Sequence, residues 1–593
     1  MPIDFTNTNL LWTSILAETL YHLGLTTAVV CPGSRSAPLA IAFANHPQIE
    51  AIPVLDERSA GFFALGLARQ QKQPVVLVCT SGTAGANFFP AVIEARESRV
   101  PLLILTADRP PELRDCNAGQ AIEQHRLYGN FPNWHTELAL PSLDPVLLAY
   151  ARQTIIQAWR STLLPSPGAV HLNLPFREPL APLPEAPAQA RALTFDEKEF
   201  FGFMQTAPAV SPTDSHASAL SLSTLPLATW KATTHGVIIA GLAQPESAQT
   251  YCEAIARLAE VLGFPVLAEG LSPLRSYGHV VPNLMTTYDL ILRNATLAAK
   301  LTPEVVIRIG EMPTSKQLRT WLAATQPLQW IVDAGDRNLD PLHGKTVHLP
   351  LQVEHLAALL SADVAPASPY LELWQRAETQ TRAAVDQFMR DTTSLFEGKI
   401  AWLLSHGLPS ETPIFICSST PVRDVEFFWR SSNLRLQPFF NRGANGIDGS
   451  LSTALGIAHR QSPAVMLTGD LALLHDTNGF LLRRHFVGHL TIILINNNGG
   501  GIFEMLPIAQ FEPVFETFFS TPQTIQFADY CKTYGVEYEL IETWETLEKR
   551  LNPLPQTGIR VLEIQTDRKA DARSRQNNLG QFAANITLHP YAS

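Results

Sequence analysis

Acid and amide side chains in the last third of the chain follow two apolar segments that are expected to be strands. Asp470 comes shortly after the segment 464–467, and Asn497 and Gly499 come shortly after the segment 490–495. Because neighbouring parallel strands end at one edge of a sheet, a carboxylate, an amide oxygen and a backbone carbonyl are expected to meet there. Such hard oxygen ligands suit Mg²⁺ that also holds a phosphate group. Alternatively, Asp470 caps a helix and the asparagines form a turn.

A second acidic side chain, Glu57, follows a short apolar segment at 51–55. A carboxylate in such a loop is able to act as a general base or to hydrogen-bond a heterocyclic nitrogen. It is equally able to cap the following helix or to face solvent. Taken alone, this position leaves both interpretations open.

The elements that must position these residues alternate along the whole chain. Short apolar segments are separated by segments of helical length, such as 59–71 and 87–98, which is typical of parallel sheets covered by helices. We predict an α/β fold with three doubly wound parallel-sheet domains, whose ligands bind at the loops after the strands. The expected strands lie at 27–31, 51–55, 74–79, 100–105, 236–240, 265–268, 305–309, 330–332, 347–349, 413–417, 464–467, 490–495 and 561–564.

Breaks in this alternation predict where the domains end. The segment 181–192 is rich in Pro and Ala, 207–223 is polar without periodicity, and 361–369 is a further break. They are expected to be linkers and loops. The predicted domains are therefore 1–183, 194–362 and 370–593. The residues alone do not show whether the first and third domains are structural relatives.

Composition limits the class of protein. The 593 residues are 46% hydrophobic and 16% charged, which is typical of a globular chain, and the formal net charge of −11 disfavours nucleic acid as a partner. No apolar run is long enough to span a bilayer, so no membrane span is expected. The first residues do not resemble a signal peptide. The six cysteines form no CxxC pair. We expect them to be reduced and buried, in a cytoplasmic protein.

The chain has an acid in one α/β domain and an Asp–Asn pair in another. In this pattern it resembles the thiamin diphosphate (ThDP) enzymes. More narrowly, the chain resembles the MenD family, the 2-succinyl-5-enolpyruvyl-6-hydroxy-3-cyclohexene-1-carboxylate (SEPHCHC) synthases. Leu471 stands where many ThDP enzymes have Gly, which favours the narrower resemblance. The stretches that carry it are CPGSRSAPLA (31–40), DERSAGFFALGLA (56–68), TSGTAGAN (80–87), TADRPPELRD (106–115), GQAI (119–122), EMPTSKQL (311–318), NRGANGIDG (441–449), GDLALLHD (469–476) and NNNGGGIFEMLP (496–507).

The resemblance implies an activity with two substrates. MenD enzymes use ThDP and Mg²⁺, with Mn²⁺ as a possible substitute, to decarboxylate 2-oxoglutarate. They then add the succinyl carbanion in 1,4 fashion to isochorismate, which gives SEPHCHC and CO₂ in menaquinone or phylloquinone biosynthesis. The resemblance also implies at least a homodimer, and by family habit a homotetramer, with active sites between subunits.

The resemblance further implies roles for individual residues. Glu57 matches the catalytic residue that hydrogen-bonds N1′ of the ThDP pyrimidine. Asp470, Asn497 and the Gly499 carbonyl match the metal ligands. Ile447 matches the residue that props ThDP into its bent conformation. The residues that match an apolar wall beside the cofactor are Ile502, Phe503 and Leu506.

Both implied substrates are dicarboxylates, so an acidic chain needs local positive charge at its site. Arginine is able to hold a carboxylate through two parallel bonds. The matching residues are the cations Arg35, Arg109, Arg423, Arg442 and Lys316 with the neutral hydrogen-bond partners Ser34, Gln120 and Ser419. Lys316 lies in the middle domain, which carries the fewest matching stretches. His475 is expected to be structural.

Two other classes of protein remain as alternatives. Another ThDP-dependent 2-oxo-acid decarboxylase or carboligase would use Glu57, Asp470 and Asn497 in the same way, but would not need the set of arginines. An inactive regulatory relative would be expected to lack Glu57 or a metal ligand, and this chain has all of them.

Overall fold

Three parallel sheets organise the chain, as the sequence predicts, and each has six strands. The computed structural model describes residues 3–206, 225–360 and 364–586. These residues form two compact units. Unit 1 contains the described residues up to 206 with Asn441–Gln461 and His475–Gly488, and unit 2 contains 225–440, Ser462–Leu474 and 489–586 within the same ranges. No helix in the described ranges is long and apolar enough to cross a membrane.

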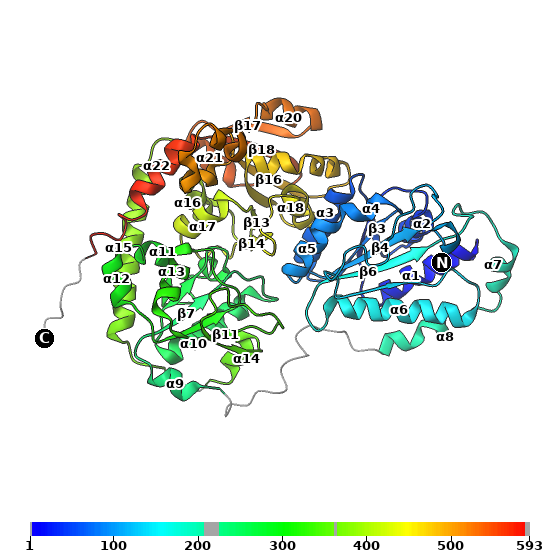
Figure 1. Ribbon diagram of the computed structural model, residues 1–593, viewed down its shortest axis with the longest axis horizontal. Helices are drawn as coiled ribbons and strands as arrows, with labels where there is room; N and C mark the ends of the chain where they lie inside the picture. The colour runs from blue at the N-terminus through cyan, green and yellow to red at the C-terminus, as the bar shows by residue number, and fades with distance from the viewer. Residues whose placement is uncertain (1–2, 207–224, 361–363, 587–593) are drawn as a thin grey trace. The chain divides into compact units, whose positions relative to one another are not determined.

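The sheet of unit 1 has the strand order β2-β1-β3-β4-β6-β5, with every neighbouring pair parallel. Helices cover both faces, because side chains at 76 and 78 pack with α1, α2 and α6 while α3 contacts β3 from the other face (Figure 1). The strands are β1 (Thr27–Val30), β2 (Glu50–Pro53), β3 (Val75–Cys79), β4 (Leu102–Asp108), β5 (Trp134–Glu137) and β6 (Ala169–Pro175). The helices before 207 are α1 (Thr8–His22), α2 (Ala37–Asn45), α3 (Glu57–Gln71), α4 (Thr83–Asn87), α5 (Phe89–Glu97), η1 (Pro111–Leu113), α6 (Pro145–Leu163), α7 (Ala186–Arg191), α8 (Glu197–Phe201) and η2 (Gly202–Thr206).

Two later segments also belong to unit 1: α18 (Ser450–Ala458) and η6 (Thr477–Arg484). Helix α18 lies beside α3 (Figure 1) at very short backbone distance. A Cβ atom at Gly66 would lie 2.1 Å from the carbonyl oxygen of Thr453, and one at Gly456 would lie 2.2 Å from that of Phe63. Only glycine allows these two helices to pack so closely.

The middle sheet, in unit 2, has the order β12-β11-β10-β7-β8-β9. This is the order of the dinucleotide-binding α/β fold, with its switch point between β10 and β7. The strands are β7 (Gly236–Ala240), β8 (Val266–Ala268), β9 (Leu284–Met285), β10 (Val305–Ile309), β11 (Leu328–Val332) and β12 (Lys345–Leu349). The accompanying helices are α9 (Leu227–Ala232), α10 (Ala248–Leu262), η5 (Pro273–Ser276), α11 (Tyr288–Ile291), α12 (Ala295–Lys300), α13 (Lys316–Thr325) and α14 (Val353–Ala358).

The last sheet has the order β14-β13-β15-β16-β18-β17, which repeats the order of the first sheet strand for strand. The first and third sheets are therefore relatives in topology, which the residues alone did not reveal. The strands are β13 (Pro413–Ile416), β14 (Gln437–Phe439), β15 (Ala464–Gly469), β16 (His489–Asn496), β17 (Glu537–Leu540) and β18 (Gly558–Gln565). The helical segments are α15 (Pro369–Asp391), α16 (Glu397–Gly407), α17 (Thr420–Phe428), α19 (Asp470–His475), η7 (Gly501–Met505), η8 (Pro507–Gln510), η9 (Glu516–Ser520), α20 (Phe527–Tyr534), α21 (Trp544–Leu551) and α22 (Arg568–Asn578).

Two expectations from the sequence need correction. The segment 181–192 is not linker throughout, because α7 forms within it: alanines favour a helix, Pro187 is tolerated in the first turn, and Ala188 is fully buried. Of the six free cysteines, Cys116 is exposed and the other five are buried. The predicted loop at 207–223 lies outside the described residues, as does 361–363 of the predicted break at 361–369.

Candidate active site

The ends of β15 and β16 carry the acid and the amide that the sequence singles out. The two strands are parallel neighbours with Gly469 opposite Ile495, so the residues that follow them share one sheet edge. Asp470 is buried, and its Oδ2 accepts a 2.8 Å hydrogen bond from the Gly499 backbone N–H. Its Oδ1 accepts a 2.7 Å bond from the Leu471 N–H. Asp470 therefore ties the two strand ends together.

The neighbouring asparagines have different roles. Asn496 forms the turn, because its Oδ1 accepts a 3.2 Å bond from the backbone N–H of Asn498. Asn497 is buried, and its Nδ2 donates a 2.6 Å bond to Glu397 Oε1. Its Oδ1 is buried with no hydrogen-bond partner among the described residues. A buried acceptor without a partner is costly, and a bound cation would satisfy it.

The electrostatics of this edge also suit a cation. Burial raises the pKa of Asp470 to about 6, and its backbone hydrogen bonds only partly offset that effect. A divalent cation nearby would favour the ionised carboxylate. No group of three or more His, Cys, Asp or Glu side chains in the described ranges could hold a metal. A metal here would use one carboxylate and neutral oxygens, as Mg²⁺ shared with a diphosphate does.

In unit 1, Glu57 is the first residue of α3, but it is not the helix cap. Asp56 caps the helix, because its Oδ1 accepts a 2.9 Å bond from the Ser59 N–H. Glu57 is half-buried, and its side chain makes no hydrogen bond within the part of the chain that the structure describes. Burial, and then the charge of Glu57, raises the pKa of the Cys79 thiol, so the carboxylate lies near the end of β3. A capping role is therefore excluded, and the carboxylate is available to a ligand.

Two arginines of unit 1 lie close to each other. Arg35 is only 7% exposed, and burial followed by the positive charge of Arg109 lowers its pKa. Arg35 Nη1 donates to the Phe176 carbonyl at 2.9 Å. Arg109 donates from Nε to the Gly119 carbonyl at 3.1 Å and from Nη1 to Ser81 Oγ at 3.2 Å. Arg35 Nη2 also pairs with Oε1 of the exposed Glu178 at 3.4 Å, and a bound anion near both arginines would offset their mutual repulsion further.

The loops around these arginines depend on residues that the sequence analysis did not single out. Gln124 is buried; its Oε1 accepts a 2.8 Å bond from the Gly82 N–H, and its Nε2 donates to the Ala107 carbonyl at 3.1 Å. It thus joins the loops after β3 and β4. A Cβ at Gly82 would lie 3.4 Å from Gln120, so the exposed Gln120 lies against the same loop. Ser34, after β1, is also exposed.

The segment that carries Arg442 and Ile447 is anchored to α5. The backbone N–H groups of Gly443 and Ala444 donate to the buried Glu94 carboxylate at 3.0 and 2.7 Å. Arg442 and Ile447 are both half-buried. Gly449 ends the segment at φ +62°, and a Cβ there would lie 1.9 Å from the Phe62 ring of α3. The path of this segment therefore requires glycine.

The remaining predicted residues lie in unit 2. Ser419 precedes α17 with φ +76°, a strained conformation for serine, and Arg423 Nη1 donates to its carbonyl at 2.6 Å. Lys316 is exposed at the first position of α13. Ile502 and Phe503 are half-buried in η7, whereas Leu506 is 46% exposed. Asp470, Asn497 and Gly499 lie together in this unit, while Glu57, Arg35, Arg109 and Arg442 lie in unit 1.

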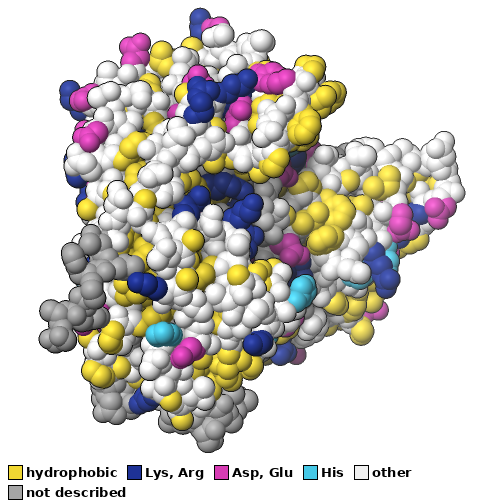
Figure 2. Space-filling model, turned by 60° about the vertical axis from the view of Figure 1, so that its left-hand side comes forward, with side chains coloured by type: hydrophobic (Ala, Val, Ile, Leu, Met, Phe, Trp, Pro, Cys, Tyr) yellow, Lys and Arg dark blue, Asp and Glu magenta, His cyan; other side chains and the backbone are white. Residues whose placement is uncertain are grey.

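Lys and Arg side chains are unevenly distributed over the face drawn in Figure 2, although the formal net charge of the chain is −11. Figure 2 shows Lys and Arg side chains gathered near the centre of the face drawn and again near its top, while acidic side chains are scattered over it. Local concentration of one sign of charge is what a site for dicarboxylates needs.

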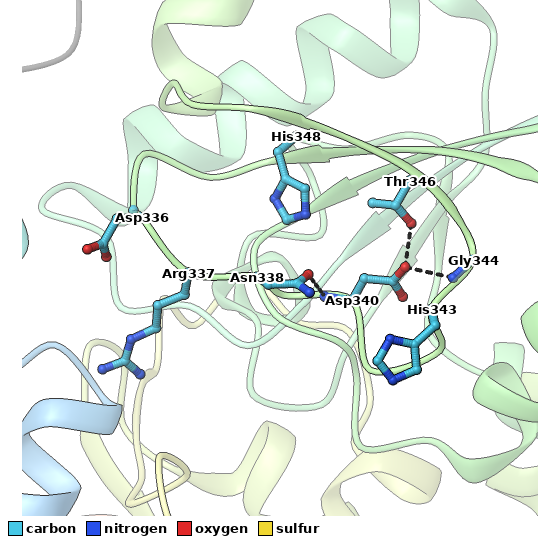
Figure 3. Close-up of a pocket in the computed structure, with 9 residues that line it drawn as sticks. Asp336, Arg337, Asn338, Asp340, His343, Gly344, Thr346 and His348 are labelled. Carbon is cyan, nitrogen blue, oxygen red and sulfur yellow. Dashed lines mark hydrogen bonds between the residues drawn. The ribbon is translucent and has the colours of Figure 1, made fainter.

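A polar pocket of about 490 Å³ lies beside β12, at the edge of the middle sheet (Figure 3). None of the predicted site residues lines it. The loop between β11 and β12 forms most of it, with Thr346 and His348 of β12. Asp340 holds this loop, because its Oδ2 accepts bonds from the Gly344 N–H at 2.8 Å and from Thr346 Oγ1 at 2.7 Å. No motif in the sequence pointed to this pocket.

Comparison with known proteins identifies the superfamily. Residues 12–129 match the family described as "Thiamine pyrophosphate enzyme, N-terminal TPP binding domain". Residues 211–416 match "Middle domain of thiamine pyrophosphate". Benzoylformate decarboxylase from Polynucleobacter necessarius has the same fold, with a TM-score of 0.66 and 18% identity over 94% of this chain and 98% of that one.

Curated relatives are similar over almost the whole chain. The 2-succinyl-5-enolpyruvyl-6-hydroxy-3-cyclohexene-1-carboxylate synthase of Trichormus variabilis is 60% identical over 98% of this chain and 99% of its own. The enzyme of the same name from Gloeothece citriformis is 58% identical over 98% of this chain and 100% of its own. Such identity at full length goes beyond a shared fold and establishes membership. The chain belongs to the 2-succinyl-5-enolpyruvyl-6-hydroxy-3-cyclohexene-1-carboxylate synthase family of thiamine pyrophosphate enzymes.

Proposed function

We propose that the protein joins 2-oxoglutarate to isochorismate, releasing CO₂ and giving SEPHCHC for menaquinone or phylloquinone biosynthesis. The observation that carries the proposal is the unpartnered, buried Oδ1 of Asn497 beside Asp470 at the shared end of β15 and β16. This edge suits a metal-bound diphosphate, and the names of the 58–60% identical relatives support the choice of reaction.

We further propose that ThDP and Mg²⁺, replaceable by Mn²⁺, bind at this edge. Asp470, Asn497 and the Gly499 carbonyl would hold the metal, and Ile447, Ile502, Phe503 and Leu506 would contact the organic part of the cofactor. When bound, ThDP supplies an electron sink for loss of CO₂ from a 2-oxo acid. Glu57 would share its proton with N1′ of the pyrimidine, which its freedom from a capping role allows.

The cationic side chains would hold the substrate carboxylates. The proximity of Arg35 and Arg109 supports a role in binding an anion, since burial and then the charge of Arg109 lower the pKa of Arg35. We assign both, with Arg423, mainly to isochorismate, whose ring carboxylate gains negative charge during 1,4-addition. Ser34, Gln120 and Ser419 would donate neutral hydrogen bonds, and Arg442 and Lys316 would serve either substrate.

We propose that the active enzyme is at least a homodimer, and a homotetramer by family habit, with active sites between subunits. Large apolar side chains exposed after η7 support an interface, because monomeric surfaces seldom expose so many together. They are Leu506, Phe511, Val514 and Phe518, each 46–73% exposed. We also propose a cytoplasmic location, which six free cysteines support. The three sheets support domains at 1–183, 194–362 and 370–593.

Product analysis tests the function. Purified protein is incubated with 2-oxoglutarate, with and without isochorismate, and ThDP or Mg²⁺ is omitted in parallel. Mass spectrometry is expected to detect SEPHCHC only when both substrates and both cofactors are present. A different ThDP-dependent decarboxylase would release an aldehyde from a 2-oxo acid at full rate without isochorismate, and that result would reject the proposal.

A further inference from the structure

A buried network of charged side chains lies behind Asn497. Glu397, the first residue of α16, is 1% exposed. Its Oε1 accepts the 2.6 Å bond from Asn497 Nδ2, and its Oε2 accepts a 2.6 Å bond from Arg575 Nη2. Arg575 is also buried and donates to the two oxygens of Asp424 at 2.9 and 2.6 Å. The network therefore joins α16, α17 and α22 to the loop after β16.

Such a network is a poor way to gain stability. Taking charged groups out of water costs several kcal/mol for each ion, and the attraction between them often does no more than offset that cost. The cost is visible at Asp571, which accepts a hydrogen bond from the Glu397 N–H: burial raises the pKa of its carboxyl, because the charged form is poorly solvated there. We therefore ask which groups this network positions. At the strand ends Glu397 accepts a short bond from the Asn497 amide at 2.6 Å and a long one from the Thr566 hydroxyl at 3.4 Å.

The chemistry of the two groups fixes the direction of that amide. An ionised carboxylate only accepts hydrogen bonds, so the NH₂ end of Asn497 must face Glu397 and Oδ1 must point away from it. Arg575 donates to the other oxygen of Glu397, so both carboxylate oxygens act as acceptors in the structure. With Nδ2 occupied in this way, Oδ1 is the end without a partner.

We propose that Glu397, supported by Arg575, is a positioning residue that orients Asn497 so that Oδ1 faces the divalent cation. The inference rests on the proposed function, because it assumes that Asn497 is a metal ligand. Outer partners of this kind commonly change metal affinity by about 10- to 100-fold when they are replaced.

The adjacent asparagine provides a matched control. Asn496 Nδ2 donates to the buried Glu563 at 2.7 Å, so it also pairs with a carboxylate. However, Asn496 Oδ1 accepts from the Asn498 N–H, so no free oxygen results from that pairing. Glu563→Gln therefore removes a comparable buried charge from beside a residue that is not a proposed metal ligand.

The test measures Mn²⁺ affinity by electron paramagnetic resonance in the presence of ThDP, with thermal unfolding as a check on folding. In Glu397→Gln the new amide is able to donate to Oδ1 and let Asn497 turn over. In Glu397→Asp the charge remains, but the carboxylate withdraws from the 2.6 Å contact. Both variants are expected to bind Mn²⁺ at least about 10-fold more weakly than wild type. The Mn²⁺ affinity of Glu563→Gln is expected to stay within about twofold of the wild-type value, because Glu563 contacts no residue that is proposed to bind the metal.

Each outcome bears on a different claim. Wild-type Mn²⁺ affinity in either variant, Glu397→Gln or Glu397→Asp, when that variant is folded, overturns the positioning role. If Glu397→Gln does not fold, Glu397→Asp carries the test. Absence of ThDP-dependent Mn²⁺ binding in the wild-type protein overturns the proposed function itself. Loss of binding in Asp470→Ala, with wild-type binding in both Glu397 variants, overturns only the present inference.

Discussion

Arg109→Lys is expected to weaken the second half of the reaction while leaving the first half largely intact. The change keeps the positive charge at the end of β4 and removes the planar fork. In the structure Arg109 uses Nε for the Gly119 carbonyl and Nη1 for Ser81 Oγ, which leaves Nη2 for a carboxylate. A lysine ammonium is a single point charge and cannot keep both anchors while it binds substrate.

The size of the effect follows from the loss of one charge-assisted hydrogen bond. Such a bond contributes about 1.5–3 kcal/mol, which corresponds to a decrease of about 10- to 150-fold in kcat/KM for isochorismate. The two halves are assayed separately in single turnover. Release of CO₂ from 2-oxoglutarate reports the first half, and consumption of isochorismate reports the second.

Arg160→Lys is the control, since Arg160 is exposed on α6. It is expected to leave both half-reactions unchanged. The assignment of Arg109 to isochorismate is wrong if CO₂ release falls about 10-fold or more while kcat/KM for isochorismate is that of the wild type.

Three further perturbations test other parts of the structure. Glu57→Gln is expected to fold normally and to lose about 10²–10⁴-fold in kcat, because an amide cannot exchange the proton with N1′; turnover near wild type would remove Glu57 from the catalytic site. Gly66→Ala places a Cβ 2.1 Å from the Thr453 carbonyl and should destabilise unit 1 by about 1–3 kcal/mol in thermal unfolding. The control Gly202→Ala should not destabilise the protein, because the space around Gly202 is open. Equal midpoints of thermal unfolding for the two variants would refute the close packing of α3 and α18. Burial lowers the pKa of His171 to about 3, so its neutral form stabilises the fold above pH 6.5 and that stability is lost as the pH falls. Between pH 7.5 and 5 the free energy of unfolding should fall by about 2 kcal/mol from this effect. If the stability of His171→Gln depended on pH as steeply as that of the wild type, the assignment to His171 would be wrong.

Hydrophobic patterning predicts the inner strands well because they are buried on both faces and are continuously apolar. The five strands that it misses are β5, β6, β9, β14 and β17. Four of these, β5, β9, β14 and β17, are the last strands at the edges of their sheets, where one face or side meets solvent and polar residues are tolerated. The fifth, β6, is interrupted by His171 and Asn173, whose buried side chains pair with Thr106. A polar network in the core has no apolar pattern to reveal it.

The candidate site was predictable where chemistry-bearing residues follow strands directly. Asp470 and Asn497 are examples, since parallel neighbours must end at one edge. Glu397 was not predictable, because it lies 100 residues from Asn497 along the chain and only the fold brings the two side chains to 2.6 Å. Gln124 and Glu94 were missed for the same reason. Each accepts a hydrogen bond from the backbone of a loop that is distant along the chain, and the residues next to it in the sequence form no recognisable motif.

The central claim is that one site couples loss of CO₂ to formation of a carbon–carbon bond with isochorismate. The most direct measurement is the ratio of CO₂ released to isochorismate consumed in a single turnover of the wild-type protein loaded with ThDP and Mg²⁺. Coupled chemistry predicts equal amounts of the two, with neither formed nor consumed when ThDP is omitted. Release of CO₂ with no consumption of isochorismate would contradict the account.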